Sequence, residues 1–427
     1  MPQTPPPREL LLGAFGAAVA AVKAESLLPP HLPPRPEGRL VVVAAGKAAA
    51  DMAACAERHY PDHAHLAGLA ITRHGHGAPT RRIRVVEAGH PLPDEAGLAA
   101  AEDLLELVRD ARPQDRVLAL LSGGGSSLLT LPAGGLDLAD VQATGRGLLN
   151  SGAPIADINC VRKHLSSTLG GHLAQACAAP VTALLLSDVV GDDPCVIASG
   201  PFTADATTYA DALAVLRRWR IPVPAPIRAH LEQGASGAFP DTPKAGDACF
   251  TRVDTRIVGN GATALAGAST WLGTQGVETV VQGDHFAGEA RVLARKHAAS
   301  VREVCRRRLP GSPPVALLSG GEAQVTVRGR GRGGRNAEFL LALALELQGL
   351  AGVHALAADT DGIDGSEDNA GALLAPDTLD RAAALGQNAR ARLDDNDAYG
   401  FFSALGDLVM TGPTRTNAND FRVILLA

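Results

Sequence analysis

Short apolar runs alternate with longer amphipathic stretches along most of the chain. Leu40–Ala45 (LVVVAA), Arg116–Leu121 (RVLALL) and Pro180–Leu186 (PVTALLL) contain almost no polar positions, so both faces of each segment are predicted to be buried. Helical segments flank these runs, and a glycine-rich or acidic turn follows each one. This order predicts an α/β fold with parallel strands, in which ligands bind beyond the carboxyl ends of the strands.

The pattern is interrupted in the middle of the chain and then resumes. A proline-rich tract at Ile221–Pro226 and a polar stretch at Gln233–Gly246 separate the two halves. In the second half we expect strands at Arg256–Gly261, Val277–Gly283, Val353–Ala358 and Arg422–Leu426, and a helix at Asn336–Leu347. The chain has 427 residues, and a single core stops growing at roughly 250–300 residues. We therefore predict two domains, residues 1–250 and 251–427.

Composition excludes several classes of protein. A net charge of −6 and an aromatic content of 3% argue against a nucleic-acid binder. The apolar stretch Leu10–Val22 is too short to span a bilayer and predicts a first helix, so we expect no membrane segment. The six cysteines form no CxxC pair, which favours reduced thiols and a cytoplasmic protein.

Ser122–Ser127 (SGGGSS) follows one of the buried strands directly. Successive glycines let the backbone approach a ligand and turn its N–H groups toward phosphate or carboxylate oxygens. The alternative is a tight turn that binds nothing. No Walker A motif occurs in the chain, so an ATP enzyme of this sequence is not a P-loop protein. Lys47 follows another strand and is predicted to bring a positive charge to the same sheet edge.

Aspartates cluster after two further strands. Asp188, Asp192 and Asp193 follow Pro180–Leu186, and Asp359, Asp361 and Asp364 follow Val353–Ala358. Dense carboxylates repel one another unless a cation lies among them, and oxygen-only clusters suit Mg²⁺ shared with phosphates. Helix capping explains one of these residues more readily than it explains both clusters.

The segment Arg328–Arg335 (RGRGRGGR) admits two interpretations. Its glycines at 329, 331 and 334 match G-x-G-x-x-G, the fingerprint of dinucleotide-binding folds. That fingerprint normally has small residues between its glycines and lies in the first βαβ unit. We favour an anion-binding loop in which Arg335, at a helix N-terminus, clamps a phosphate.

Polar residues also occur in predicted rigid turns. They are His90 in GHPLPD, His164 with Arg162 in RKHLSSTLGG, and the run Asn417–Asp420 (NAND). Contact with a small carboxylate and structural hydrogen bonding both remain open for them.

Taken together, these motifs resemble a known family. VAAGKAA, GHPLPDEAG, LLSGGGSSLL, INCVRKHLSSTLGG, LLLSDVVGDDPCVIASGPF, SGGEAQVTVRGRGRGGRNAEF, ADTDGIDG and TGPTRTNANDF occur in the order seen in the glycerate 2-kinases with a C-terminal MOFRL domain. The resemblance implies an N-terminal Rossmann-like α/β/α domain, a smaller C-terminal α/β MOFRL domain and an active site in the cleft between them. It also implies transfer of the γ-phosphate of ATP to (R)-glycerate with Mg²⁺, giving 2-phosphoglycerate and ADP.

The residues and the resemblance together predict a set of site residues. The catalytic residues are Lys47, Arg335 and Asp361; the phosphate or nucleotide contacts are Ser122, Gly123, Gly124, Gly125, Ser126, Ser127, Gly320, Gly321, Glu322 and Asn336; the substrate contacts are Arg162, His164 and Asn419; and the metal ligands are Asp188, Asp192 and Asp359. The expected partner is glycerate, with no nucleic acid and no membrane, and a homodimer is left open.

Two alternatives stay open at this point. The first is an NAD(P)H-dependent hydroxypyruvate reductase, which rests on the glycines at 329–334 and on a label that the family has long carried. It needs a ribose partner about 20 residues further on, and Asp359 falls near that distance. The second is a non-catalytic binder of small anions, which leaves the aspartate clusters without a purpose.

Overall fold

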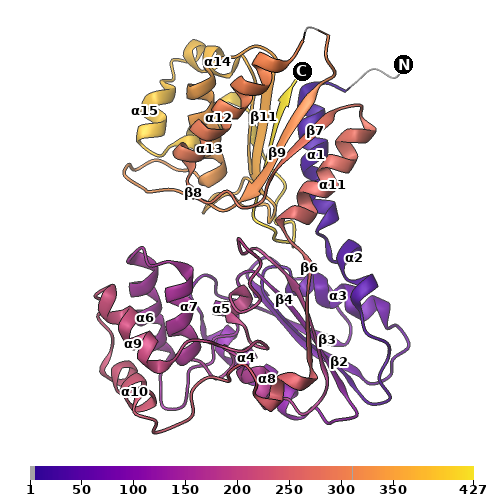
Figure 1. Ribbon diagram of the computed structural model, residues 1–427, viewed down its shortest axis with the longest axis vertical. Coiled ribbons are helices and arrows are strands. Elements are labelled where there is room, and N and C mark those ends of the chain that lie inside the picture. The colour runs from indigo at the N-terminus through magenta and orange to yellow at the C-terminus, as the bar shows by residue number, and fades with distance from the viewer. Residues whose placement is uncertain (1–4, 310) are drawn as a thin grey trace. The chain divides into compact units, whose positions relative to one another are not determined.

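The computed structural model describes residues 5–309 and 311–427, and the chain divides into two compact units. Leu27–Val258 form one unit, and the residues up to Ser26 join Gly259–Ala427 in the other. Each unit has its own six-stranded sheet and its own apolar core (Figure 1).

The Leu27–Val258 unit is built on a sheet with the strand order β3-β2-β1-β4-β5-β6. Its strands are β1 (Leu40–Ala45), β2 (Leu66–Arg73), β3 (Ile83–Ala88), β4 (Arg116–Ser122), β5 (Val181–Leu186) and β6 (Val253–Gly259). The pairings from β3 through β5 are parallel. The chain first runs outward from β1 to β3, then returns to β4 beside β1 and continues the other way. The α/β prediction is confirmed, and the strand order reverses between β1 and β4.

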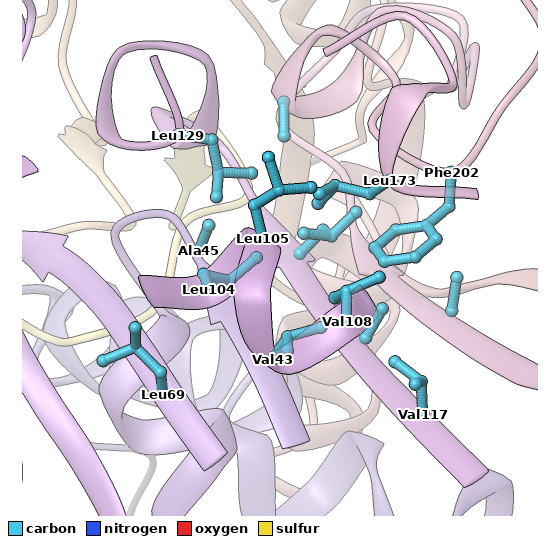
Figure 2. Close-up of a cluster of buried hydrophobic side chains, with 14 of the residues drawn as sticks. Val43, Ala45, Leu69, Leu104, Leu105, Val108, Val117, Leu129, Leu173 and Phe202 are labelled. Carbon is cyan, nitrogen blue, oxygen red and sulfur yellow. The ribbon is translucent and has the colours of Figure 1, made fainter. Parts of the chain in front are cut away.

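Helices cover both faces of this sheet. They are α3 (Ala49–His59), α4 (Glu95–Arg109), α5 (Gly125–Leu128) and α8 (His172–Ala176). Figure 2 shows Leu104, Leu105 and Val108 of α4 packed near Val43 and Val117 of the sheet. Helix α3 contacts β1 and β2 but contributes nothing to this cluster, so it covers the opposite face.

A separate helical layer completes the unit. It consists of α6 (Leu138–Asn150), α7 (Ile155–His164), α9 (Tyr209–Arg218) and α10 (Ala225–Ala235). These helices share an apolar cluster of their own that includes Leu148, Val161, Leu216 and Leu231. One of these helices, α7, carries Arg162, which the sequence predicts as a substrate contact.

The other unit contains a mixed sheet with the order β13-β12-β11-β14-β9-β7. Its strands are β7 (Glu278–Gly283), β9 (Val315–Gly321), β11 (Val353–Asp359), β12 (Gly371–Leu374), β13 (Leu408–Val409) and β14 (Asp420–Leu426), and a two-stranded ribbon joins β8 (Gly288–Glu289) to β10 (Ala323–Gln324). Only β7 and β9 pair in parallel within the larger sheet. The second α/β domain is thus confirmed.

Its helices also lie on two faces. They are α1 (Pro7–Ala21), α11 (Gly261–Thr274), α12 (Ala290–Arg307), α13 (Arg335–Leu347), α14 (Thr378–Ala384), α15 (Ala389–Asp394) and α16 (Ala398–Leu405), with the short α2 (Ala24–Leu27) after α1. Helices α12 and α13 share the main core with the sheet. Helices α1 and α11 contact each other and the sheet but lie outside that core, so they cover the other face.

The N-terminal helix lies in a different unit from the one expected, since residues 1–250 were predicted to form one domain. Helix α1 packs on α11 so closely that a Cβ at Gly13 would overlap the ring of Trp271, and one at Gly267 would lie 2.5 Å from Ala21 Cβ. The first 26 residues therefore belong with the C-terminal half. Strand β6, expected to open the second domain, is instead the last strand of the first sheet. Among the described residues, no helix combines the length and apolar character needed to cross a bilayer.

Candidate active site

The glycine turns after β1 and β4 are tied together where the strand order reverses. Gly46 has a φ of 127°, and a Cβ at this position would overlap Ser122. The N–H of Lys47 donates to the carbonyl oxygen of Gly123 at 2.8 Å, and the N–H of Ala48 donates to Ser122 Oγ at 3.0 Å. Lys47 therefore lies at the start of the Ser122–Ser127 loop.

The same loop is packed closely on its other side. Gly124 has a φ of 83°, and a Cβ there would lie 3.0 Å from His90 Nε2 and 3.4 Å from Lys47 Cγ. A Cβ on Gly125 would lie 2.6 Å from Ala198 Cβ. Contacts this short are not tolerated by larger residues without movement of the backbone. The loop is thus held in one shape, as a preformed anion site requires.

A segment with left-handed backbone conformation packs against the glycine loop. Its residues were not among the predicted site residues. Ala198 and Ser199 have φ values of 51° and 56°, which are costly for residues other than glycine. Ser199 Oγ lies 2.8 Å from Ser126 Oγ and donates to Asn159 Oδ1 at 3.0 Å. The signal in the sequence is the ASGP run after the acidic turn.

Three positively charged residues act on His90 at this edge. Lys47 follows β1, Arg73 ends β2, and Arg162 lies on α7. Within the described chain, neither Arg73 nor Arg162 forms an ion pair, whereas Arg39 and Arg84 of the same unit each pair with an aspartate. Burial lowers the pKa of the Arg162 guanidinium. A bound anion would compensate such a buried positive charge.

Two histidines at the edge are held neutral. Burial, reinforced by the charges of Lys47, Arg73 and Arg162, lowers the pKa of His90 to about 3. Burial and the charge of Arg73 lower the pKa of His76 to about 4. Both imidazoles therefore add hydrogen-bonding groups at neutral pH rather than further positive charge.

The acidic turn after β5 lies in this unit as well. Asp188 is half-buried, and Asp192 has a φ of 55° with its N–H donating to the carbonyl oxygen of Val189 at 3.0 Å. Asp193 caps the following turn by accepting from the N–H of Cys195 at 2.8 Å. In the part of the chain that the structure describes, no three His, Cys, Asp or Glu side chains are grouped to hold a metal ion. Of the expected metal ligands, Asp359 belongs to the other unit.

His164 does not reach this edge. Its Nδ1 lies 2.7 Å from the carbonyl oxygen of Cys160, and its Nε2 lies 3.0 Å from Asp241 Oδ1. The ring is 1% exposed and packs against Tyr209. Both nitrogens are used within the helical layer, so the expected substrate contact at His164 is replaced by a structural role.

In the second unit, Arg335 begins α13 and is surrounded by carboxylates. Its Nε donates to Asp420 Oδ1 at 2.7 Å, its Nη2 to Asp359 Oδ2 at 2.7 Å and its Nη1 to Glu322 Oε1 at 3.2 Å. Burial alone would lower the pKa of Arg335, but Asp420, Asp359, Glu322 and Asp364 together raise it well above its usual value. The guanidinium is therefore permanently charged and fixed in orientation.

Asp420 connects Arg335 to a second, fully buried arginine. Arg422 donates to Asp420 Oδ2 at 2.5 Å and lies over the ring of Phe339, 5.0 Å from its centroid. Asp420 Oδ2 also accepts from the N–H of Ala323 at 2.8 Å. Arg422 Nε and Nη1 have no hydrogen-bond partner among the described residues. This carboxylate thus holds two arginines in place.

The start of α13 is capped from a distant loop. Asp364 accepts from the N–H groups of Asn336 at 2.9 Å and Ala337 at 2.8 Å. Burial and the nearby charge of Asp420 raise the pKa of Asp364 to about 7 despite these two hydrogen bonds. Asn336, expected to contact nucleotide, is fully buried, and its Nδ2 donates to Asp420 Oδ1 at 2.8 Å.

Asp361 and Asn419 lie in the loops beside Asp359. Asp361 Oδ1 accepts from the N–H of Ile363 at 2.9 Å, and its own N–H donates to Asp359 Oδ1 at 3.0 Å. Asn419 has a φ of 64°, and its carbonyl oxygen accepts from the N–H and the hydroxyl of Thr360. The expected catalytic and substrate residues of this unit thus surround the strand ends that hold Arg335.

Gly320 and Gly321 have a packing role at the end of β9. A Cβ on Gly321 would overlap the backbone of Phe286. The N–H of Phe286 donates to the carbonyl oxygen of Gly320 at 3.2 Å, and the N–H of Glu322 donates to that of Phe286 at 3.1 Å. These glycines bring the loop after β7 onto the strand, which accounts for them without a nucleotide.

The arginine-glycine loop does not have the form of a dinucleotide fingerprint. The N–H groups of Gly329 and Gly331 donate to Asn396 Oδ1 at 3.0 Å and to the carbonyl oxygen of Asp395 at 2.9 Å. A Cβ on Gly334 would overlap Asp364. The N–H groups from Arg328 to Arg332 all donate to protein groups, so they are not directed at a pyrophosphate. The glycines permit close packing instead.

Comparisons with known proteins agree with this two-part organisation. Residues 10–232 match a domain of unknown function (DUF4147), and residues 315–420 match the MOFRL family. A D-glycerate 2-kinase from Thermotoga maritima is 37% identical, with 98% of each chain covered. A crystal structure of glycerate kinase from the same organism superposes with a TM-score of 0.86 over 98% of this chain and 99% of that one. A protein from Agrobacterium vitis, provisionally named hydroxypyruvate reductase, is 47% identical over 98% of this chain and 94% of its own.

Proposed function

Because this chain belongs to the glycerate 2-kinase family, with its DUF4147 and MOFRL domains, we propose that it transfers the γ-phosphoryl group of ATP to (R)-glycerate, giving 2-phosphoglycerate and ADP. Both substrates are anions, and the transferred group is an anion as well. The protein must therefore supply positive charge and N–H donors at fixed positions.

The carboxyl edge of the first sheet supports the proposal most directly. Lys47 lies at the start of a glycine loop whose shape is fixed by contacts at Gly46 and Gly125. Arg73 and Arg162 add positive charge that no carboxylate within the described residues offsets. We assign Ser122–Ser127 to phosphate binding and Lys47 to neutralising the transferred group.

Arg335 is suited to act when charge develops during transfer. Three of its five N–H donors are engaged by Asp420, Asp359 and Glu322, which leaves two for a phosphoryl oxygen. A guanidinium already fixed in place needs little reorganisation to stabilise a transition state. Asp361 is the candidate acceptor of the proton from the 2-hydroxyl. That Lys47 and Arg335 serve one reacting pair stays a prediction.

Mg²⁺ would enter with ATP as part of the substrate. It keeps most of its waters and usually takes one or two protein carboxylates together with phosphate oxygens. Asp188, Asp192 and Asp359 are the carboxylates that we assign to it, and their oxygen-only chemistry fits.

The direct test is a coupled assay with purified protein, ATP, Mg²⁺ and (R)-glycerate. We expect ADP release that depends on glycerate, and phosphorus NMR should identify the product as the 2-phosphate. A protein that releases no ADP under these conditions would contradict the proposal, and a 3-phosphate product would contradict its regiochemistry.

A reductase acting on hydroxypyruvate is the alternative that the related Agrobacterium name suggests. It needs a dinucleotide site, and the glycine run at 329–334 is engaged with Asn396 and Asp395. Asp359, the expected ribose partner, accepts a hydrogen bond from Arg335. We therefore expect no oxidation of NADH or NADPH when hydroxypyruvate is added, which absorbance at the nicotinamide band measures.

A further inference from the structure

The charged edge of the Leu27–Val258 unit contains more cations than a phosphate loop needs. Lys47 lies beside the glycine loop, whereas Arg73 comes from the end of β2 and Arg162 from α7. The charges of both guanidiniums act on the imidazole of His90. The two arginines come from segments other than the glycine loop.

Two carboxylates of this unit, Glu87 and Asp94, are engaged by other groups. Glu87 accepts from the N–H groups of Gly75 at 3.1 Å and Gly77 at 2.8 Å. Asp94 accepts from the N–H of Gly97 at 2.9 Å and lies 3.2 Å from His74 Nε2. Arg73 and Arg162 therefore have no carboxylate within ion-pair distance in the described chain, and an incoming one would fill that role.

His90 is placed to contact the same ligand. Its Nε2 lies 3.0 Å from the position of a Cβ on Gly124, so the ring borders the glycine loop. It is neutral at physiological pH and can donate one hydrogen bond.

Arg162 lies near the segment that follows His90. It lines a small cavity together with Pro91, Pro93 and Ser127. Guanidinium groups bind carboxylates through paired, charge-assisted hydrogen bonds.

We propose that Arg73, Arg162 and His90 form the subsite for the carboxylate of the acceptor, a small 2-hydroxy acid. This inference rests on the proposed kinase function. It leaves Lys47 and the glycine loop for the phosphoryl group, and it makes the carboxylate the feature by which the enzyme recognises its acceptor. Glycerol, which has the hydroxyls without the carboxylate, should then be a poor acceptor.

The test compares Arg73→Gln, Arg162→Gln and His90→Ala with the control Arg84→Gln, which removes an exposed arginine paired with Asp103. Each of the first three variants should raise the KM for glycerate by about tenfold or more, because a charged hydrogen bond is lost, while the KM for ATP stays constant. The control should leave both values unchanged. His90→Gln, which keeps a neutral N–H donor, should restore most of the loss, and Arg162→Lys should give an intermediate KM.

Other outcomes overturn the assignment. A raised KM for ATP with a constant KM for glycerate would mean that the edge binds nucleotide phosphate, and no change in either would remove the subsite. Trp219 fluorescence of each variant shows whether this unit is folded. If the wild-type protein does not phosphorylate glycerate, the kinase proposal fails, and calorimetric titration with glycerate, lactate and glycerol then decides the subsite alone. Binding of both acids but not of glycerol supports it, and binding of none refutes it.

Discussion

Asp420→Asn is the substitution whose effect follows most directly from the contacts of the second unit. Asp420 Oδ1 accepts from Arg335 Nε at 2.7 Å and Asn336 Nδ2 at 2.8 Å. Asp420 Oδ2 accepts from the N–H of Ala323 at 2.8 Å and from Arg422 at 2.5 Å. An asparagine amide placed here has its NH₂ facing two donors in either orientation. It also removes the negative charge between the two arginines.

The expected cost is large because Arg422 is fully buried. Removing one partner of a buried ion pair costs about 3–5 kcal/mol, since the other charge is left uncompensated. A buried N–H without an acceptor adds about 1–3 kcal/mol, although the two terms overlap here and do not sum. We expect the free energy of unfolding of this unit to fall by about 3–5 kcal/mol. Arg335 should also lose its fixed orientation, so kcat should fall.

Fluorescence can report the two units separately. The chain has two tryptophans, Trp219 in the first unit and Trp271 in the second. Urea denaturation in a Trp219→Phe background therefore follows the second unit alone, and Trp271→Phe follows the first. Asp377→Asn is the matched control, because Asp377 lies in the same unit as Asp420, is exposed and pairs with Arg381 at the surface. The urea midpoint of this control variant should equal that of the parent protein.

An unchanged unfolding transition at Trp271 in Asp420→Asn would contradict this prediction. A shift in the Trp219 transition alone would contradict it as well. The double variant Asp420→Asn/Arg422→Met provides a further check. When both charges are removed, the remaining apolar side chain can pack against Phe339, so the double variant should be more stable than the sum of the single losses implies. Strict additivity would mean that the two groups do not interact.

Three further predictions concern the site. Lys47→Ala should lower kcat by about 10²–10³-fold with a smaller change in KM for either substrate, measured by ADP release, and an unchanged kcat would remove Lys47 from the mechanism. Gly125→Ala places a methyl group 2.6 Å from Ala198 Cβ, so it should shift the glycine loop and reduce kcat by roughly 10²-fold; retained activity would show that the loop tolerates movement. The folded-state pKa of Asp364 is raised to about 7, so the stability that its protonated form adds is present in acid and lost as pH rises through 7. The difference in unfolding free energy between wild type and Asp364→Asn should therefore shrink between pH 5 and 8. A difference that is constant or grows would contradict the raised pKa.

The central strands could be predicted because they are apolar on both faces. The run Leu40–Ala45 coincides with β1, and Arg116–Leu121 lies within β4. Strands β2 and β3 lie toward the edge of the sheet and mix exposed with buried positions, so their pattern carried no clear signal. The partner of α1 was not predictable either, because the helix pattern shows that one face is buried but not which unit covers it.

Site residues could be predicted where they follow the carboxyl ends of adjacent parallel strands, because such residues lie close together in space. Lys47 and Ser122 were expected at one edge for that reason, and β1 and β4 are adjacent. Arg73 was missed because β2 was not recognised as a strand. The pairing of Arg335 with Asp420 joins residues 85 positions apart, and no local pattern encodes it. His164 has a polar, turn-like context, but the sequence does not show that Asp241 uses its second nitrogen.

Arg162 and Arg335 differ in their ion pairing before substrate binds. This difference predicts that Arg162 affects KM and that Arg335 affects kcat. Arg162 has no carboxylate partner within the described residues, so the cost of its burial is offset only when an anion binds. That gain is present in the ground state and therefore appears in KM. Arg335 is already compensated by Asp420 and Asp359, so a bound substrate gains little from it. In the proposed mechanism Arg335 acts when charge develops on the transferred group, so removing it should lower kcat while leaving KM nearly constant.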